Sequence, residues 1–453
     1  MRKKLVLIGA GSSMFTQGIV LDLIENPSKY KWELALVDID SEVLQSITKL
    51  VKKMVVVKNA DLEISSSTDR CEVLSGADYV LTTIGVGGRR AWEQDVFIPR
   101  KYGIYQPVGD TAMPGGISRA MRMIPAMIDI TKDIMRLCPN AYFINYSNPM
   151  TAICRAIRKS TGFPVIGLCS GLPGTESAIA DFAGLDRKKV TSYAVGINHL
   201  TFIYDFRFEG KDAWPIVRQK LLEEYKGEFN KNIIKKLYND KTNGFSSIGD
   251  PFAWTIFNTY NAYPAPGDRH ITEFLTEGFP HGKYYGKTLG IDAYSFESTI
   301  EYGDKIHDDM VRIANSDEPL TEKFFQRMHG EHEQAVEIIN YIETDGRKIY
   351  SVNLPNNGAI PNLPKDAVIE MPAIVTANGL QPLQINDFPD VLAGIISRYL
   401  AIVEITVEAA LKGDRKLFEE AILMGGYISD RSLISNMVSK LIEAQKQYLP
   451  QYK

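Results

Sequence analysis

The feature that most restricts the possible folds is a glycine turn between a short apolar run and a helical pattern near the N-terminus. Residues 4–8 form a mainly apolar run that leads into Gly9 and Gly11, after which apolar residues recur at roughly helical spacing over 15–24. A second apolar run follows and ends at Asp38. This order of strand, helix and strand predicts a βαβ unit at the start of the chain.

The glycine turn also indicates a nucleotide site. Gly9 and Gly11 let the backbone approach a pyrophosphate at the N-terminus of the following helix, and Ser12 belongs to the same turn. An acid at the end of the second strand, here Asp38, binds the adenosine ribose hydroxyls and disfavours a 2′-phosphate, so NAD is favoured. The third glycine of the complete fingerprint is replaced by Met14. A similar turn also occurs for structural reasons in α/β proteins that bind no nucleotide.

Further strand patterns alternate with helical ones through the first half of the chain. We expect a helix over about 41–59 and a strand over 77–84 that leads into Gly85-Val-Gly-Gly88. Later strands are expected over 141–146 and 165–168, and each of these two ends at a polar cluster. Such alternation predicts an α/β fold with a Rossmann-like, doubly wound sheet and right-handed crossovers.

The pattern changes in the second half, where helical stretches dominate. Examples are 389–412 and 414–424, the second with Asp414 as its N-cap. We therefore predict a Rossmann domain over 1–195 and a mostly helical α+β lobe over 196–453, which share one site. The last forty residues receive no role beyond helical packing or subunit contact.

Composition and charge exclude several classes of partner. The 453 residues are 45% hydrophobic and carry a net charge of −4, so no basic surface indicates nucleic acid or an anionic membrane. The N-terminal apolar run is too short for a signal peptide, and no run of about 18 apolar residues could span a bilayer. We therefore expect a cytoplasmic protein. The four cysteines include no Cys-x-x-Cys pair, so neither a disulfide framework nor a structural zinc site is indicated.

Polar residues after predicted strands are candidates for a ligand pocket, because ligands bind beyond the carboxyl ends of strands in an open α/β sheet. Asn145 and Asn148 follow one strand, and Asp110 lies in a Pro-Val-Gly-Asp-Thr segment. Each is equally compatible with a turn or capping role.

Cys169 and His199 are candidates for a metal site. Cys169 ends another predicted strand, and its thiolate and the imidazole of His199 are ligands suited to a borderline divalent metal. Their spacing alone favours a buried cysteine and a core histidine.

A further polar segment spans residues 258–270. It combines Tyr260 with Gly267-Asp-Arg-His270, which supplies a phenol, an acid, a guanidinium and an imidazole. Arg269 could pair with a carboxylate or a phosphate. Taken alone, the segment is typical of a solvated loop.

Taken together and in this order, these segments resemble glycoside hydrolase family 4. The similarity extends from residue 5 to about 365, and its specificity comes from the combination of short motifs. The matching stretches are Ile8-Gly-Ala-Gly-Ser, Gly103-Ile-Tyr-Gln-Pro-Val-Gly-Asp-Thr, Pro114-Gly-Gly-Ile, Asn145-Tyr-Ser-Asn-Pro-Met, Gly196-Ile-Asn-His, Gly267-Asp-Arg-His and Val352-Asn-Leu-Pro-Asn-Asn-Gly.

The resemblance implies a Rossmann core like that of lactate and malate dehydrogenases. It also implies bound NAD, contacted by Asn145 as well as the glycine turn, and Mn²⁺ or another divalent metal held by Cys169 and His199. Such glycosidases depart from the usual two-carboxylate mechanism. NAD⁺ takes a hydride from C3 of the sugar, a base removes the acidified C2 proton, and the aglycone leaves C1 by elimination. Water then adds and NADH returns the hydride, while the metal stabilises the enediolate.

The resemblance assigns further residues. Tyr260 is the expected C2 base and Tyr263 the alternative, provided that a nearby metal lowers the phenol pKa from its ordinary value of about 10. Asn148 is expected to hold a sugar hydroxyl, and Asp110 to contact substrate or water. Relatives carry His, Asp or Asn where this chain has Ser170. Serine is a weak acid, so either the leaving group is a good one or another residue or water protonates it.

Substrate and assembly follow from the same resemblance. Several stretches are most similar to the α-galacturonidase branch, where Arg269 would pair with the uronate carboxylate, and the α-glucosidase branch is the neighbouring possibility. A homodimer or homotetramer is expected because relatives are commonly of these kinds. One alternative is an NAD-dependent sugar or hydroxy-acid dehydrogenase, although the Asp–His–Arg relay of such enzymes is not evident in this sequence. The other alternative is a non-enzymatic NAD sensor.

Overall fold

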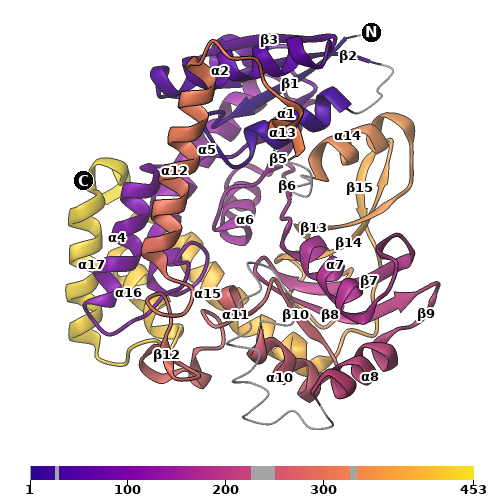
Figure 1. The fold of residues 1–453 in the computed structure, drawn as a ribbon. Helices are drawn as coiled ribbons and strands as arrows, with labels where there is room; N and C mark the ends of the chain where they lie inside the picture. Colours follow the sequence, from indigo (N-terminus) through magenta and orange to yellow (C-terminus); the bar gives the residue numbers. More distant parts are fainter. Residues whose placement is uncertain (1, 26–29, 226–249, 327–333, 453) are drawn as a thin grey trace.

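The computed structural model describes residues 2–25, 30–225, 250–326 and 334–452. Over these residues the chain forms one thirteen-stranded sheet, of which one half is parallel and the other antiparallel, and a separate two-stranded hairpin. Figure 1 shows the parallel half at the top, beside the N-terminus, and the antiparallel half at the lower right.

The parallel half comes from the N-terminal part of the chain. The strand order of this half is β3-β2-β1-β4-β5-β6. From β1 the chain proceeds towards one edge, and from β4 it proceeds towards the other. The position between β1 and β4 is therefore the switch point of a doubly wound sheet. Its strands are β1 (Arg2–Ile8), β2 (Lys31–Val37), β3 (Leu62–Ser67), β4 (Tyr79–Thr82), β5 (Tyr142–Asn145) and β6 (Ile166–Gly167).

The antiparallel half continues the same sheet in the order β6-β13-β14-β7-β8-β10. The two halves join where Asn353 of β13 pairs with Gly167 of β6. Its strands are β7 (Val190–Ile197), β8 (Leu200–Phe208), β9 (Lys211–Asp212), β10 (Tyr263–Ala265), β13 (Ile349–Pro355), β14 (Val368–Thr376) and β15 (Gly379–Pro382), and the separate hairpin is β11 (Lys283–Tyr284) with β12 (Lys287–Thr288).

Helices surround this sheet and cover its apolar strands. Leu5, Val6 and Leu7 of β1 are completely buried, as expected for a central parallel strand with both faces covered. The helices of the first half are α1 (Thr16–Glu25), α2 (Ser41–Val57), α3 (Cys71–Leu74), α4 (Gly88–Arg100), α5 (Met113–Leu137), α6 (Met150–Thr161) and α7 (Gly171–Ala183). The later ones are α8 (Trp214–Tyr225), α10 (Pro251–Tyr260), α11 (Asp268–Ile271), α12 (Phe296–Asn315), α13 (Glu322–Gln326), α14 (Gln334–Thr344), α15 (Asp390–Lys412), α16 (Arg415–Met424) and α17 (Arg431–Gln445).

The predicted α/β architecture, with helices prominent in the C-terminal part, is confirmed. The Asp414 carboxylate caps α16 by accepting hydrogen bonds from the backbone N–H groups of Lys416 and Leu417 at 2.8 and 3.2 Å. The predicted boundary at residue 195 falls inside β7, where the sheet is continuous, and the division there stays a prediction. None of the described helices is long and apolar enough to cross a membrane.

Candidate functional site

The glycine turn lies at the switch point between β1 and β4. Gly9 has a φ of +92°, and a Cβ there would lie 2.9 Å from the backbone nitrogen of Ile84. A Cβ on Gly11 would lie 2.7 Å from Oδ2 of Asp38, which accepts a hydrogen bond from the Gly11 N–H at 2.8 Å. Both positions therefore require glycine, and the resulting backbone cradle borders on the acid that ends β2.

Ser12 and Asn145 hold the backbone around this crevice. The Ser12 hydroxyl accepts a hydrogen bond from the Phe15 N–H at 3.4 Å. The Asn145 side chain is completely buried, accepts from the Thr82 hydroxyl at 3.0 Å, and exchanges two hydrogen bonds with the Ser147 backbone. Asn145 thereby shapes the loop after β5, and direct contact of either residue with a cofactor stays a prediction.

A compact group of side chains that could hold a metal ion lies next to this loop. Ligand atoms of Asp110, His199 and His270 all lie within 4.8 Å of one another. His199 occupies the tight turn between β7 and β8 with a φ of +69°, and His270 lies in the short helix α11. The two imidazole rings are 4.1 Å apart between centroids. We call these three residues the Asp–His–His cluster.

Hydrogen bonding orients His199 for a metal ion. The Thr111 hydroxyl donates to Asp110 Oδ1 at 2.7 Å and lies 2.9 Å from His199 Nδ1. Because the hydroxyl proton goes to Asp110, the hydroxyl oxygen accepts from His199 Nδ1–H, and Nε2 keeps its lone pair for a ligand bond. The sequence placed His270 in a polar segment without assigning it to the metal site, because nothing local links it to His199.

Burial and charge set the protonation of the cluster. Burial lowers the pKa of His199, and burial together with the neighbouring His199 lowers the pKa of His270 well below its ordinary value. Burial alone would raise the pKa of Asp110, but the adjacent imidazoles and Arg119 outweigh it and hold that pKa below its usual value. Two neutral imidazoles and a carboxylate are the forms in which these groups bind a metal.

Cys169 lies close to the segment that carries His270. Its Sγ accepts a hydrogen bond from the Gly171 N–H at 3.4 Å, and a Cβ on Gly171 would lie 2.9 Å from Cβ of Pro266. Cys169 is not one of the three residues whose ligand atoms lie within 4.8 Å, so its role in metal binding stays a prediction. Ser170 directly precedes α7 and is exposed.

Asn148 connects the cluster to the loop after β5. Its Nδ2 donates to Asp110 Oδ2 at 3.0 Å, while its Oδ1 is buried and has no hydrogen-bond partner among the described residues. The Nε of Arg119 donates to the backbone carbonyl of Asn148 at 3.0 Å. The sequence reasoning missed Arg119, although it follows the Pro114-Gly-Gly-Ile motif closely.

Two arginines flank Asp110, and neither forms an ion pair with a described carboxylate. Burial lowers the pKa of both Arg119 and Arg269, and Asp110 opposes this shift in each case. Arg269 donates from Nη2 to the Thr299 hydroxyl at 2.9 Å, and its Nε is buried without a described partner. A half-buried guanidinium that lacks an ion pair is a candidate site for binding an anion.

A buried acid supports the loop between α4 and α5, which carries Asp110. One carboxyl oxygen of Glu273, Oε1, accepts hydrogen bonds from the backbone N–H groups of Val108 and Gly109 at 2.7 and 2.8 Å. Burial raises the pKa of Glu273 to about 8. The group therefore keeps its proton at neutral pH and holds the backbone next to Asp110 in place.

The two tyrosines proposed as base differ in their surroundings. Tyr260 ends α10 and is 36% exposed, and none of the hydrogen bonds between described residues joins it to the Asp–His–His cluster. Tyr263 lies in β10, buried against Trp254 and Phe257. Burial and the nearby Asp250 raise the pKa of Tyr263 well above its ordinary value, which disfavours the phenolate form needed of a base.

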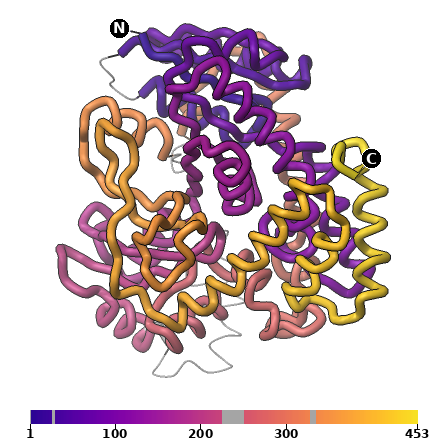
Figure 2. The backbone as a smooth tube through the Cα atoms, turned by 180° about the vertical axis from the view of Figure 1, so that it is seen from behind, coloured from indigo at the N-terminus to yellow at the C-terminus, as the bar shows by residue number. Residues whose placement is uncertain are grey.

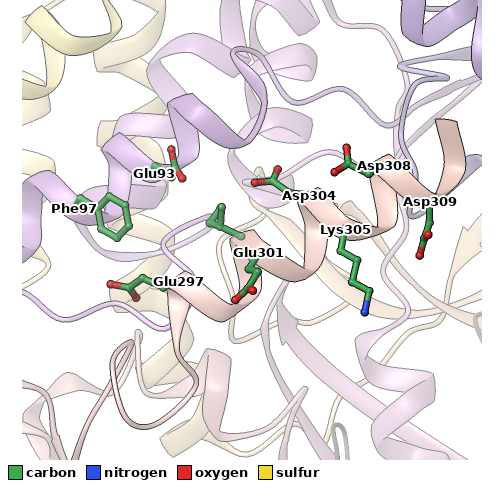
Figure 3. A pocket seen from close by; sticks show the side chains of 9 residues that line it. Glu93, Phe97, Glu297, Glu301, Asp304, Lys305, Asp308 and Asp309 are labelled. Atoms are coloured by element: carbon green, nitrogen blue, oxygen red, sulfur yellow. The ribbon is translucent and has the colours of Figure 1, made fainter. Parts of the chain in front are cut away.

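A pocket of about 500 Å³ lies elsewhere, between α4 and α12 (Figure 3). Acids of α12 face Glu93 and Phe97 of α4 across it, and Arg89 and Arg90 pair with Asp304. No residue of the Asp–His–His cluster lines this pocket. It is therefore separate from the candidate site. Its lining residues are Glu93, Phe97, Glu297, Ile300, Glu301, Asp304, Lys305, Asp308 and Asp309.

Comparison with known proteins covers most of the chain. The model of "Family 4 glycosyl hydrolase" matches residues 4–185, and that of its C-terminal domain matches residues 194–425. An α-galacturonidase from Thermoanaerobacterium saccharolyticum is 31% identical over 463 residues, which is 98% of this chain and 96% of that protein. An α-glucosidase from Erwinia rhapontici is 29% identical over 472 residues and 99% of each chain.

Solved structures share the fold. A 6-phospho-β-glucosidase from Thermotoga maritima, solved with manganese, NAD⁺ and glucose-6-phosphate, has a TM-score of 0.80 at 24% identity, covering 98% of this chain and 99% of that chain. A malate dehydrogenase from Cryptosporidium parvum has a TM-score of 0.54 at 14% identity, covering 91% and 99%. The predicted dehydrogenase-like fold is thereby confirmed.

Proposed function

Because the chain belongs to family 4 of the glycosyl hydrolases, as its motifs predicted, we propose that it cleaves O-glycosides at the Asp–His–His cluster with the help of NAD and a divalent metal such as Mn²⁺. The observation that carries this proposal is the Asp–His–His cluster, a donor set suited to a borderline divalent ion, beside a glycine cradle. In this proposal a redox cofactor site and a metal site lie at the same edge of one continuous sheet.

The residues fit both groups. Gly9 and Gly11 let the turn pack closely against the residues after β4 and against Asp38, and a pyrophosphate would bind at the N-terminal end of the helix that follows this turn, with its ribose near Asp38. The metal would be held by His199, with His270, Asp110 and the predicted ligand Cys169 as its other candidate partners. When bound, NAD supplies reversible oxidation at C3 of the sugar, and the metal supplies positive charge beside O2 and O3.

The chain's own residues supply orientation and proton transfer in this proposal. The orphaned Asn148 Oδ1 accepts a hydrogen bond from a sugar hydroxyl, which satisfies a buried acceptor. Tyr260 takes the C2 proton as the base, and Tyr263 is the second choice. Asp110 contacts substrate or a water molecule. With Ser170 at the position next to Cys169, a water molecule is the proton donor for the leaving group.

We further propose that the sugar carries an acid group, most simply an α-galacturonide. Support comes from Arg119 and Arg269, two half-buried guanidinium groups that flank Asp110 and form an ion pair with no described carboxylate. The 31% identity to an α-galacturonidase agrees with this choice. A uronate carboxylate would satisfy a guanidinium through two parallel hydrogen bonds. A cytoplasmic homodimer or homotetramer remains our expectation, which light scattering and cell fractionation would check.

The test is aglycone release from chromogenic α- and β-glycosides, uronides and 6-phosphoglycosides included. Reactions are run under reducing conditions with and without NAD⁺ and Mn²⁺, while NADH absorbance is recorded. We expect release to require both additives, without accumulation of NADH. NADH formed in proportion to substrate, without aglycone, would instead establish the alternative of an NAD-dependent dehydrogenase.

A further inference from the structure

The end of the chain packs against the loop that follows β4 and contacts the glycine turn. The match to the family's C-terminal domain stops at residue 425, so it assigns no role to residues 426–452. The loop of residues 83–88 follows β4 and faces the glycine turn, since the Thr83 hydroxyl donates to the Gly9 carbonyl at 2.8 Å. In Figures 1 and 2 the C-terminal helix α17 runs beside α4, which begins at this loop.

A buried chain of polar contacts links α17 to the loop. Gln445, the last residue of α17, donates from Nε2 to Asp95 Oδ1 at 2.6 Å. Asp95 forms a completely buried bidentate ion pair with Arg122. The Nε of Arg122 donates to the carbonyl oxygen of Val86, inside the loop, at 2.8 Å. The C-terminus is thereby connected to the loop through three side chains, all at most 1% exposed.

A second contact reaches the loop directly. Gly87 has a φ of +78°, and a Cβ there would lie 2.7 Å from Cε2 of Tyr448. The Tyr448 ring therefore lies against the loop backbone at a position where only glycine leaves room. The loop also contains Gly85 and Gly88, so its backbone has unusual conformational freedom unless neighbouring groups restrict it.

We propose that the segment of residues 445–448 positions the 83–88 loop for dinucleotide binding. This inference rests on the proposed NAD site, because the loop after β4 borders the switch point at which a dinucleotide binds. Gln445 orients the Asp95–Arg122 pair that holds the Val86 carbonyl, and the Tyr448 ring restricts Gly87. Tyr448 and Gln445 are positioning residues: they act on the cofactor through the loop and touch neither substrate nor metal.

The experiment measures the dissociation constant of NAD⁺ by isothermal titration calorimetry on the full-length protein and its variants. Tyr448→Ala removes the ring from the loop, and Tyr448→Phe keeps it. Tyr452→Ala is the matched control: it removes a ring of the same segment, but its hydroxyl reaches Met121 and Ala409, outside the loop. Tyr448→Leu serves as a second variant if Tyr448→Ala fails to fold.

We expect Tyr448→Ala to raise the dissociation constant of NAD⁺ about tenfold. This is the effect of a loop that adopts its binding conformation in about a tenth of the molecules, because the apparent dissociation constant rises in inverse proportion to that fraction. Tyr448→Phe and Tyr452→Ala should bind NAD⁺ like the wild type, and all variants should bind Mn²⁺ equally in electron paramagnetic resonance titrations. If folded Tyr448→Ala binds NAD⁺ as tightly as the wild type, or if Tyr452→Ala loses as much affinity as Tyr448→Ala, this inference is wrong and the proposed function is unaffected. A wild-type protein that binds no NAD⁺ would overturn the proposed function itself.

Discussion

The side-chain amide of Asn148 donates a hydrogen bond to Oδ2 of Asp110 at 3.0 Å and leaves its own Oδ1 buried without a described partner. The two residues are 38 positions apart in the chain. Asn148 lies in the loop after β5, and Asp110 lies in the loop that joins α4 to α5, not after a strand as the sequence predicted. This pair joins the Asp–His–His cluster to the loop after β5. It also fixes the direction of the buried Asn148 Oδ1, which we propose accepts a hydrogen bond from a sugar hydroxyl.

Replacing Asn148 by Ala should therefore lower kcat/KM by about 10- to 100-fold, as expected for the loss of a hydrogen bond next to a charged group. The effect should fall on substrate turnover and leave the affinity for Mn²⁺ nearly unchanged, because Asp110 keeps its Thr111 contact. Steady-state kinetics and a Mn²⁺ titration check this. A variant with normal kinetics would remove Asn148 from the substrate site.

Alanine at His270 or Cys169 tests the metal ligands separately. We expect His270→Ala to weaken Mn²⁺ binding at least about tenfold, because the ligand atoms of the cluster lie close together. Cys169→Ala should abolish metal-dependent activity. NAD⁺ affinity should stay nearly intact in both, which calorimetry measures. Unchanged activity in Cys169→Ala would remove the thiol from the metal site and leave the Asp–His–His cluster as the complete protein ligand set.

Changing the arginines to Gln tests the acid group of the substrate. Arg269→Gln and Arg119→Gln should each lower kcat/KM for an α-galacturonide about 10- to 100-fold, because a charge-assisted hydrogen bond is lost. Turnover of the neutral α-galactoside, if measurable, should change much less. The ratio of the two kcat/KM values is the decisive number, and equal losses on both substrates would rule out carboxylate recognition by that arginine.

Glu273→Gln should change how stability depends on pH. Burial raises the folded-state pKa of Glu273 to about 8, far above its ordinary 4.5, so folding favours the protonated acid. The contribution of this acid to stability is complete below about pH 4.5 and is lost as pH rises towards 8. Glutamine mimics the protonated form, so the Tm of the variant relative to wild type should increase from pH 5 to pH 8. A pH-independent difference would contradict the raised pKa.

Tyr260→Phe tests the proposed base. Loss of the phenol should reduce kcat by about 10²- to 10⁴-fold, the usual range for general acid–base catalysis, while substrate binding changes little. Exchange of the C2 proton with deuterated water, followed by NMR, should be lost in parallel. Tyr263→Phe is the matched comparison, since it removes a phenol from a buried site. A larger loss in Tyr263→Phe would move the base to that residue.

The local elements of this protein could be predicted because their signals lie within short stretches. The strand–glycine–helix unit at Gly9, the acid at Asp38 and the cap at Asp414 depend on neighbouring residues, and the structure has each in the expected element. The metal cluster could be predicted only in part. His199 was singled out with the help of a family resemblance, whereas its contact with His270 depends on β8 and β10 pairing side by side.

The sequence by itself therefore determined the fold class, the glycine cradle and most of the candidate chemistry, because backbone conformation and burial follow local patterns. Only the tertiary structure decided which side chains meet. It set His270 against His199, left Arg119 and Arg269 without described carboxylates, and joined Gln445 to Asp95 across 350 positions of the chain. Such contacts arise from packing between distant elements, and no local pattern of residues encodes them.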